Sequence, residues 1–306
     1  MSNKLTVGVI GLGAMGMGMA QSLRRAGHSV QVFDVRREVA SAFAQDGGVA
    51  HDSLASLGAA CDVIVSVVVN AAQTESVLFG DGTTPGNMTG CAASMKPGSV
   101  FVMCSTVDPN WSVALEARLE AMGLRYVDAP ISGGAAKAAS GQMTMMTAGR
   151  PEAYAVAEPF LNAMAAKVYK LGNSAGAGSK VKIINQLLAG VHIAAAAEAM
   201  ALGLREGVDP AALYEVITNS AGNSWMFENR MAHVLAADYT PLSAVDIFVK
   251  DLGIVLDMAR ASKFPLPLSS TAHQMFMQAS TAGFAKEDDS AVIKIFPGIE
   301  LPKAPG

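Results

Sequence analysis

The chain has 306 residues, of which 51% are hydrophobic and 16% charged, and its formal net charge at pH 7 is −4. A chain of this length and composition can bury the cores of two globular domains, which excludes a disordered protein. The small negative charge and the lack of a lysine and arginine cluster exclude a nucleic acid as an expected partner.

The first predicted element is a buried strand at residues 4–11, which runs into a glycine-rich turn and a predicted helix at residues 15–26. The turn consists of Gly11, Leu12, Gly13, Ala14, Met15 and Gly16. In such a strand-turn-helix unit, the first glycine permits the turn, the second lets the backbone approach a pyrophosphate, and the third lets helix and strand pack closely. The helix N-terminus then points its free N–H groups at the phosphate charge. The pattern predicts a dinucleotide-binding site, and the structural alternative is a turn without a ligand.

The N-terminal segment does not have the features of a secretion signal, because glycines interrupt its apolar part and two arginines follow without a clear cleavage site. The three cysteines are an odd number without metal-ligand spacing, which suits reduced thiols better than a disulfide framework. The five histidines are scattered along the chain and also lack ligand spacing. We therefore expect a cytoplasmic protein without a metal site.

An acidic residue, Asp34, follows the second predicted strand. It lies eighteen residues beyond Gly16, the last glycine of the turn, where an acidic side chain binds the ribose hydroxyls of NAD. Arg36 and Arg37 come next, and an arginine in this region can instead hold the 2′-phosphate of NADP. Because Asp34 would repel that phosphate, we expect NAD, with NADP as the alternative. The two arginines are then solvated residues that open the next helix.

Strands and helices continue to alternate along the first half of the chain. Predicted strands lie at residues 29–33, 63–69, 100–104, 125–127, 142–147 and 168–171. Predicted helices lie at residues 38–45, 72–79, 109–122 and 151–164, and residues 80–98 form a glycine- and threonine-rich loop with one helical turn. This alternation predicts a parallel sheet that binds ligands at the carboxyl ends of its strands. The fold class is therefore α/β, with an N-terminal Rossmann domain, a doubly wound sheet, at residues 1–174.

Polar and small residues follow several predicted strands, where a ligand would bind. Asn70 and Thr106 each stand just after one strand and are candidate cofactor-binding residues. Farther along, Ser132, Gly133 and Gly134 form a small-residue loop whose backbone N–H groups could bind a carboxylate. Taken alone, Ser-Gly-Gly is also an ordinary turn.

A long helix is predicted at residues 179–206, between the two halves of the chain. No proline interrupts it and apolar residues occur on nearly every face, so we expect other elements to wrap it. Lys182 lies near its start, and a lysine in a packed region needs its charge compensated or its pKa lowered by desolvation. Asn185 and Gln186 share its face of the helix and could hold the amine by hydrogen bonds. The structural alternative is a lysine that snorkels from the first turn.

Beyond the long helix, the pattern changes entirely to helices. They are predicted at residues 210–219, 225–235, 243–260, 269–282 and 290–295, which gives an all-α C-terminal domain at residues 175–306. Lys250 lies on a mostly apolar helix, where its spacing alone favours an ion pair with Asp246 or Asp251. The alanine- and methionine-rich faces of this domain predict a homo-oligomer, a dimer or a tetramer. The run at residues 187–204 approaches membrane-spanning length, but it contains a histidine and a glutamate, so we expect no membrane span.

Five motifs occur in one order over nearly the whole chain: GLGAMGMGMA, STVDP, DAPISGG, GAGSKVKIINQ and FVKDLG. This set resembles the 3-hydroxyisobutyrate dehydrogenase-like family of β-hydroxyacid dehydrogenases. The resemblance implies that Lys182 is the catalytic acid/base and that the loop at residues 132–134 holds the substrate carboxylate. It also implies that Thr106 contacts the nicotinamide end of the cofactor and that Lys250 reaches the cofactor side.

One position departs from the family pattern. The family usually has an asparagine four residues after the catalytic lysine, and this chain has Gln186 there, preceded by Asn185. We assign both side chains to substrate binding, and the longer amide of Gln186 suits a polyhydroxylated ligand. Within the family, this version of the long helix is most similar to that of enzymes that oxidise a four-carbon sugar acid.

The implied chemistry is oxidation of a small hydroxy acid. Lys182, kept neutral by burial and by the cationic nicotinamide ring, would remove the hydroxyl proton while hydride passes from carbon to the ring. The loop at residues 132–134 would fix the carboxylate, so that geometry decides which carbon meets the ring. Alternative substrates are 3-hydroxyisobutyrate and tartronate semialdehyde. Outside enzymes, the chain could be an NAD-sensing module whose helical half binds a partner protein, and a membrane protein is the third possibility.

Overall fold

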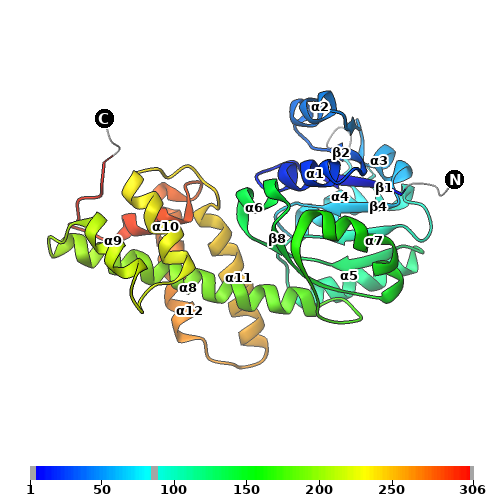
Figure 1. Ribbon diagram of the computed structural model, residues 1–306. Helices are drawn as coiled ribbons and strands as arrows, with labels where there is room; N and C mark the ends of the chain where they lie inside the picture. Colours follow the sequence, from blue (N-terminus) through cyan, green and yellow to red (C-terminus); the bar gives the residue numbers. More distant parts are fainter. Residues whose placement is uncertain (1–4, 84–88, 304–306) are drawn as a thin grey trace. The chain divides into compact units, whose positions relative to one another are not determined.

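The computed structural model describes residues 5–83 and 89–303. Residue 4, where the first strand was predicted to begin, and residues 84–88 of the predicted loop lie outside the described residues. The chain divides into two compact units, Met1–Lys182 and Ile183–Gly306, which are described here one by one (Figure 1). The domain boundary expected after residue 174 stays a prediction.

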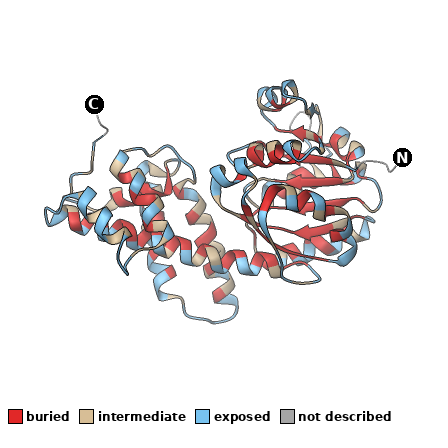
Figure 2. Cartoon of the chain, in the orientation of Figure 1, coloured by how far each residue is buried: buried red, intermediate tan, exposed pale blue. Residues whose placement is uncertain are grey.

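The first unit is built on a nine-stranded sheet within the described residues. Its strands are β1 (Thr6–Ile10), β2 (Ser29–Phe33), β3 (Val49–Ala50), β4 (Val63–Ser66), β5 (Val100–Met103), β6 (Arg125–Asp128), β7 (Ile131–Ser132), β8 (Met143–Gly149) and β9 (Ala165–Lys170). Their order is β3-β2-β1-β4-β5-β6-β8-β7, and β9 pairs with β8. The central strands are rich in valine and buried throughout, as the red strands of Figure 2 show. Strands buried on both faces are typical of a parallel sheet covered by helices.

The predicted parallel pairing holds from β3 to β6, and it fails at β8. β8 runs antiparallel to both β6 and β7, and β9 runs parallel to β8. A parallel neighbour needs a crossover that covers the sheet, usually a full helix. The helix between β6 and β8 has only 7 residues and packs on another helix, so the chain returns in the opposite direction.

Seven α-helices of the first unit flank the sheet in the described residues. They are α1 (Gly16–Arg25), α2 (Arg37–Gln45), α3 (Leu54–Ala60), α4 (Ala71–Phe79), α5 (Pro109–Ala121), α6 (Gly134–Ser140) and α7 (Pro151–Met164). A short 3-10 helix lies at Ala92–Ser94, in the loop where one helical turn was predicted. Side chains cap several of these helices, and Asp108 accepts the N–H groups of Asn110 and Trp111 at the start of α5. The sequence analysis did not predict β3, α3, β7 or α6, which are all short.

The second unit is helical, as predicted. Its helices are α8 (Ala177–Arg205), which begins in the first unit, α9 (Pro210–Thr218), α10 (Trp225–Ala236), α11 (Val245–Ala261) and α12 (Pro267–Ala279). A π-helical turn (Ser280–Phe284) and a 3-10 helix (Asp289–Ile295) follow. The core packs Ile193 of α8 against Phe248 and Leu252 of α11, together with Phe276 of α12. Close approach of α8 and α11 occurs at Gly190, where an added Cβ would lie 2.9 Å from Leu252.

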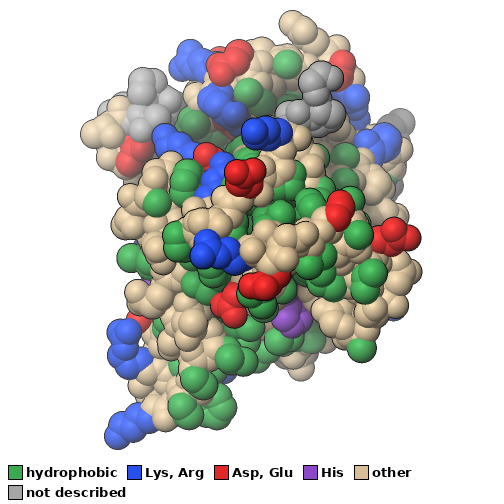
Figure 3. All heavy atoms as spheres, turned by 90° about the vertical axis from the view of Figure 1, so that its left-hand side faces the viewer, with side chains coloured by type: hydrophobic (Ala, Val, Ile, Leu, Met, Phe, Trp, Pro, Cys, Tyr) green, Lys and Arg blue, Asp and Glu red, His purple; other side chains and the backbone are tan. Residues whose placement is uncertain are grey.

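Other elements of the chain cover only part of the long helix α8. The expectation that they would wrap it is therefore wrong for the single chain. Ile184, Leu188 and Leu202 lie on its surface and are 54%, 51% and 62% exposed. On the face drawn in Figure 3, charged side chains are interspersed with hydrophobic and neutral ones. By length and composition α8 could cross a membrane, but 44% of its most apolar window is buried and a core helix passes the same test.

Candidate functional site

The glycine turn between β1 and α1 has the shape that a dinucleotide requires. Gly11 has a φ of +87°, and a Cβ on Gly16 would lie 1.8 Å from the Gly11 carbonyl oxygen, so both positions need glycine. Gly13 differs, because an added Cβ there would meet nothing within 4 Å. That open space lies where a pyrophosphate would approach the backbone. The turn therefore fits a nicotinamide dinucleotide, and a side chain at Gly13 would fill its cradle.

Asp34 lies at the end of β2 and is bonded to the same turn. Its side chain is 5% exposed, and it accepts hydrogen bonds from the Leu12 N–H at 2.7 Å and the Arg36 N–H at 2.9 Å. The Arg36 guanidinium also forms an ion pair with it, with Nε 3.2 Å from Oδ1. Burial acts to raise the pKa of Asp34, but the bonds from Arg36 and Leu12 outweigh it and lower the pKa. Asp34 is therefore a carboxylate at neutral pH, and Arg36, expected to be solvated, is also its partner.

The ends of β4 and β5 are joined by a buried serine. Ser105 is 2% exposed, donates to the Val68 carbonyl oxygen at 2.7 Å and shares a hydrogen bond with Thr74 Oγ1 at 3.0 Å. Asn70 accepts the Gln73 N–H at 2.8 Å and so caps α4. Thr106 follows Ser105 directly and is partly exposed. The structure thus places Asn70 and Thr106 after neighbouring strands, and their roles in cofactor binding stay predictions.

The segment at residues 132–134 is the end of a strand and the start of a helix, which corrects the prediction of a simple loop. Ser132 ends β7, Gly133 and Gly134 have φ values of +137° and +73°, and Gly134 begins α6. Such backbone angles are accessible to glycine. The stem of Lys137 lies over Gly133, because a Cβ there would be 2.8 Å from Lys137 Cδ. The sequence analysis did not single out this lysine.

Helix α6 packs directly on α1, as Figure 1 shows. A Cβ on Gly18 would lie 2.5 Å from the Ala139 nitrogen, and Ser22 Oγ donates to the Ala138 carbonyl oxygen at 3.0 Å. The glycine turn precedes α1 and the Ser-Gly-Gly segment opens α6. The contact between α1 and α6 therefore fixes the position of the predicted pyrophosphate site relative to the predicted carboxylate site, and both sites belong to the first unit.

Lys182 is buried near the start of α8, with 7% of its surface exposed. This burial disfavours the alternative of a lysine that snorkels into solvent. The preceding turn is held by Asp128, which is fully buried at the end of β6. Burial raises the pKa of Asp128, and hydrogen bonds donated by Ser179 and Gly176 oppose the rise. A carboxylate of the sheet thus anchors the turn that carries the lysine.

In the second unit, Gln186 belongs to a buried polar chain. Its Nε2 donates to Asp251 Oδ2, and its Oε1 accepts from Asn185 Nδ2 at 3.1 Å. The Lys250 ammonium donates to Asp251 Oδ1, as the structural alternative for Lys250 predicted. Asp251 is 1% exposed and joins the two side chains. The sequence analysis named Asp251 only as a neighbour of Lys250, because its partner Gln186 lies on a distant helix.

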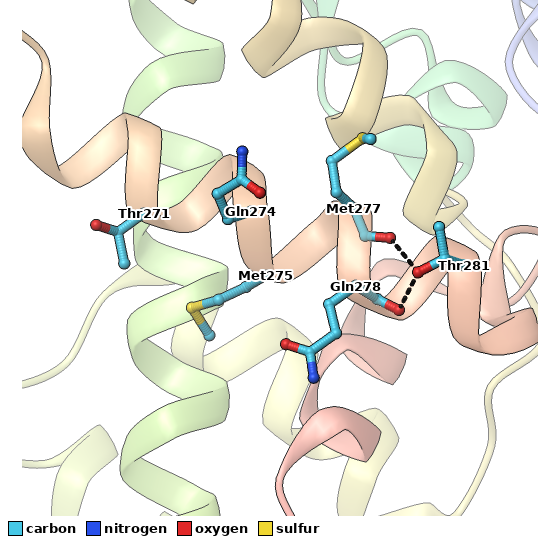
Figure 4. Close-up of a pocket in the computed structure, with 6 residues that line it drawn as sticks. All are labelled: Thr271, Gln274, Met275, Met277, Gln278 and Thr281. Atoms are coloured by element: carbon cyan, nitrogen blue, oxygen red, sulfur yellow. Dashed lines mark hydrogen bonds between the residues drawn. The ribbon is translucent and has the colours of Figure 1, made fainter.

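A surface hollow lies along α12, at a distance in sequence from all these residues. Figure 4 shows its lining side chains, which carry hydroxyl, amide and thioether groups: Thr271, Gln274, Met275, Met277, Gln278 and Thr281. Thr281 Oγ1 donates back to the carbonyl oxygens of Met277 and Gln278. None of the six can act as an acid or base near neutral pH, so this hollow is not a candidate for hydride-transfer chemistry. Among residues 5–83 and 89–303, no cluster of three or more histidine, cysteine or acidic side chains is placed to hold a metal ion.

Two family models match the chain. Residues 6–172 match the NAD binding domain of 6-phosphogluconate dehydrogenase, and residues 176–296 match the NAD-binding model of NADP-dependent 3-hydroxyisobutyrate dehydrogenase. The protein is therefore a dehydrogenase that uses a nicotinamide cofactor. It belongs to the 3-hydroxyisobutyrate dehydrogenase-like family of β-hydroxyacid dehydrogenases, as its five motifs predicted.

Individual relatives cover almost the whole chain. It is 68% identical to an L-threonate dehydrogenase of Cupriavidus necator, over 97% of each chain. It is 52% identical to an L-threonate dehydrogenase of Escherichia coli K12, again over 97% of each. Among solved structures, it is similar to a 3-hydroxyisobutyrate dehydrogenase from Salmonella typhimurium, with a TM-score of 0.90 and 52% identity over 95% of this chain and 100% of that one.

Proposed function

We propose that this protein oxidises L-threonate to 2-dehydro-L-erythronate and that NAD accepts the hydride. The observation that carries the substrate is the 68% identity, over 97% of both chains, to an L-threonate dehydrogenase. A relative 32% identical, from Rattus norvegicus, is named 3-hydroxyisobutyrate dehydrogenase, so the methyl-branched acid is the second candidate substrate. Tartronate semialdehyde is the third. The relatives are named dehydrogenases, which favours an enzyme over an NAD-sensing module.

The preference for NAD over NADP rests on Asp34. Its carboxylate is buried and ionised at the end of β2, where the adenosine ribose binds in this fold. A 2′-phosphate placed beside it would be repelled, whereas ribose hydroxyls can donate to it. Arg36 balances part of this charge through its ion pair, so we expect a preference and not a complete exclusion of NADP.

The residues of the glycine turn would hold the pyrophosphate, and Asn70, Thr106 and Lys250 complete the proposed cofactor contacts. A bound nicotinamide ring supplies the hydride acceptor. The protein itself binds and orients the hydroxy acid, and Lys182 Nζ takes the proton from the hydroxyl that is oxidised. Lysine can do this because its ammonium loses a proton more readily when desolvated, and Lys182 is 7% exposed.

The substrate itself would be held by two groups. The N–H groups of Ser132, Gly133 and Gly134 bind the carboxylate. Asn185 and Gln186 bind the remaining hydroxyls, and the bond from Gln186 to Asp251 fixes the direction of its amide. An amide that both donates and accepts suits neighbouring hydroxyl groups better than a methyl branch.

The test assays the purified protein with NAD or NADP against L-threonate and 3-hydroxyisobutyrate, and with NADH or NADPH against tartronate semialdehyde. The absorbance of the reduced cofactor follows each reaction. We expect the highest kcat/KM with L-threonate and NAD. A higher kcat/KM with another acid would mean that this acid, and not L-threonate, is the substrate. A higher kcat/KM with NADP would overturn the role given to Asp34. Light scattering on the same sample tests the proposed homo-oligomer, for which the exposed apolar residues of α8 are the support. We also propose a cytoplasmic location, because the buried thiols form no disulfide among the described residues.

A further inference from the structure

Asp128 receives hydrogen bonds from the start of α8. Its Oδ2 accepts the N–H groups of Gly176 and Ser179, both at 2.9 Å, and its Oδ1 accepts Ser179 Oγ at 2.7 Å. The carboxylate is 0% exposed and Ser179 is 1% exposed, so water does not compete for these bonds. The backbone of this turn also lies directly on the sheet, because a Cβ on Gly178 would be 2.3 Å from the Met146 carbonyl oxygen.

The geometry of a helix carries this anchor to Lys182. Ser179 and Lys182 are three residues apart on one continuous helix, so they lie on neighbouring positions of one face. A turn whose N–H groups are fixed to a buried carboxylate cannot rotate about the helix axis without breaking those bonds. The position of Lys182 is therefore set by Asp128, a residue that precedes it by about fifty positions in the chain.

Asp128 is also the start of the segment that leads to the proposed carboxylate site. It ends β6, and the chain passes through Ala129 and Pro130 to Ser132. The Ala129 N–H donates to the Met103 carbonyl oxygen at 2.9 Å, and the Pro130 carbonyl oxygen accepts the Met146 N–H at 3.0 Å, so this short segment is itself held on the sheet. One residue thus links the turn before Lys182 to the segment that ends at Ser132.

We propose that Asp128 is a positioning residue for the reaction: it holds Lys182 at a fixed place relative to the Ser-Gly-Gly segment. This inference rests on the proposed role of Lys182 as the proton acceptor. A misplacement of a reacting group by about 1 Å can lower a rate by about 100-fold, so an anchor of this kind acts on kcat. It does not contact the reacting atoms, and it acts through the lysine.

A second carboxylate offers a matched control. Glu116 of α5 accepts the Ala175 N–H at 3.1 Å, just before α8 begins. It is also buried, with 7% exposed, and burial raises its pKa. Its bond holds the connection to α8 and none of the N–H groups within the helix. Glu116→Gln therefore removes the charge of a second buried carboxylate near the start of α8. It leaves in place the bonds from Asp128 to the turn that carries Lys182.

The experiment measures kcat for NADH formation by Asp128→Asn, Lys182→Ala and the double variant, with whichever acid the panel shows to be oxidised. Asparagine has nearly the same size as aspartate, but its N–H₂ group replaces one of the two carboxylate oxygens. This group cannot accept the hydrogen bonds that Gly176 and Ser179 donate. We expect Asp128→Asn to lower kcat by about 10- to 100-fold, with the NADH dissociation constant within about twofold of the parent. In the Lys182→Ala background the same change should lower the rate by less than about twofold, because a residue that acts through Lys182 has nothing left to position. Glu116→Gln should keep kcat within about twofold.

An equal fall in rate with and without Lys182 would overturn the proposal, since a general loss of structure acts in both backgrounds. Unchanged turnover in Lys182→Ala would instead refute the proposed proton acceptor and leave no lysine to position. If Asp128→Asn does not fold, Ser179→Ala takes its place, because it removes one of the bonds and keeps the carboxylate. Its expected loss is about 2- to 10-fold in kcat, again only where Lys182 is present, and an unchanged kcat in this variant would count against the anchor.

Discussion

The two units place their polar residues in different ways. In the first unit, the candidate groups other than Lys182 lie at or just after strand ends, and the glycine turn is formed by residues close together in sequence, Gly11 and Gly16. Distant segments of this unit meet at Asp128, which bonds to Ser179. In the second unit, buried polar groups meet across distant helices. Gln186 of α8 bonds to Asp251 of α11, and Arg230 of α10 pairs with Asp289 beyond α12. A Rossmann sheet concentrates chemistry at its strand ends, whereas a helical unit uses buried pairs to fix how its helices pack.

This contrast predicts which property of the protein, turnover, cofactor binding or stability, each kind of change should affect. Changes at the strand-end turns and at the start of α8 should alter turnover and cofactor binding with little loss of stability. Changes at the buried pair of Arg230 and Asp289, which has no proposed role in binding, should alter stability first. The following predictions test that division from the largest expected effect to the smallest.

Replacing Lys182 with alanine should lower kcat by about 10²- to 10⁴-fold, because the variant lacks the proposed acceptor of the substrate's hydroxyl proton. The NADH dissociation constant, measured by fluorescence titration, should stay within about threefold, since the proposed cofactor contacts do not include Lys182. Lys180→Ala is the matched control, because Lys180 lies two positions away on α8 and is exposed. Equal losses in the two variants would remove Lys182 from the mechanism.

Replacing Arg230 with alanine should destabilise the helical unit by about 3–5 kcal/mol, because it leaves a buried carboxylate without its partner. Arg230 is 7% exposed, and it donates to both oxygens of Asp289, which is 0% exposed. The control is Arg260→Ala, since the pair of Arg260 with Asp257 is largely exposed and such pairs contribute about 0–1 kcal/mol. Chemical denaturation of both variants measures the difference.

The pH dependence of this loss has a definite sign. Burial raises the pKa of Asp289 to about 6 and Arg230 opposes the rise, so removing Arg230 raises it further. A carboxyl whose folded pKa is raised contributes stability that is complete below its ordinary pKa and lost as the pH rises through the folded value. Arg230→Ala should therefore lose more stability at pH 8 than at pH 5. A loss that is greater at pH 5 would show that the pair does not act in this way.

Two glycines of the turn should respond differently to the same added methyl group. Gly13→Ala places its Cβ in open space, so the melting temperature should not change, while NADH affinity should fall by about 1.4–2.8 kcal/mol, roughly 10- to 100-fold. Gly16→Ala places its Cβ 1.8 Å from the Gly11 carbonyl oxygen, so it should lower both the melting temperature and the affinity. Thermal unfolding and NADH titration of the pair separate a ligand contact from a packing requirement. A Gly13→Ala variant that binds NADH as the parent does would contradict the cradle.

The sequence predicted the elements whose signals are local. Glycine spacing and long apolar runs identified the central strands and the long helices, because each depends on neighbouring residues. The short elements β3 and α6 gave too few residues for a periodic pattern. The direction of β8 was missed as well, because strand direction depends on the connection between β6 and β8 and not on the residues of the strand.

For the candidate site too, the sequence predicted the features that depend on neighbouring residues and missed those that depend on distant ones. The motifs named Lys182 and the Ser-Gly-Gly segment, and the spacing after the glycine turn named Asp34. The sequence did not show which residues hold these groups in place. Asp128 is the first residue of the DAPISGG motif, yet nothing in its neighbouring sequence showed that it accepts hydrogen bonds from Ser179, about fifty positions away. Hydrogen bonds between distant segments are decided by packing, and a single sequence carries no periodic signal for them.

The smallest expected effect concerns the pair of Arg36 and Asp34. Arg36 and its bonds lower the pKa of Asp34 against the effect of burial. A carboxyl whose folded pKa is lowered contributes stability that is present above its ordinary pKa and is lost as the pH falls through the folded value. Arg36→Ala should therefore move the acid-unfolding midpoint to a slightly higher pH, and the shift is small because the Arg36 side chain is 53% exposed. Arg37→Ala, which removes the exposed neighbouring arginine, should leave the midpoint in place when both are followed by circular dichroism. Equal shifts in the two variants would mean that net charge, and not the bond to Asp34, sets the acid stability of the sheet unit.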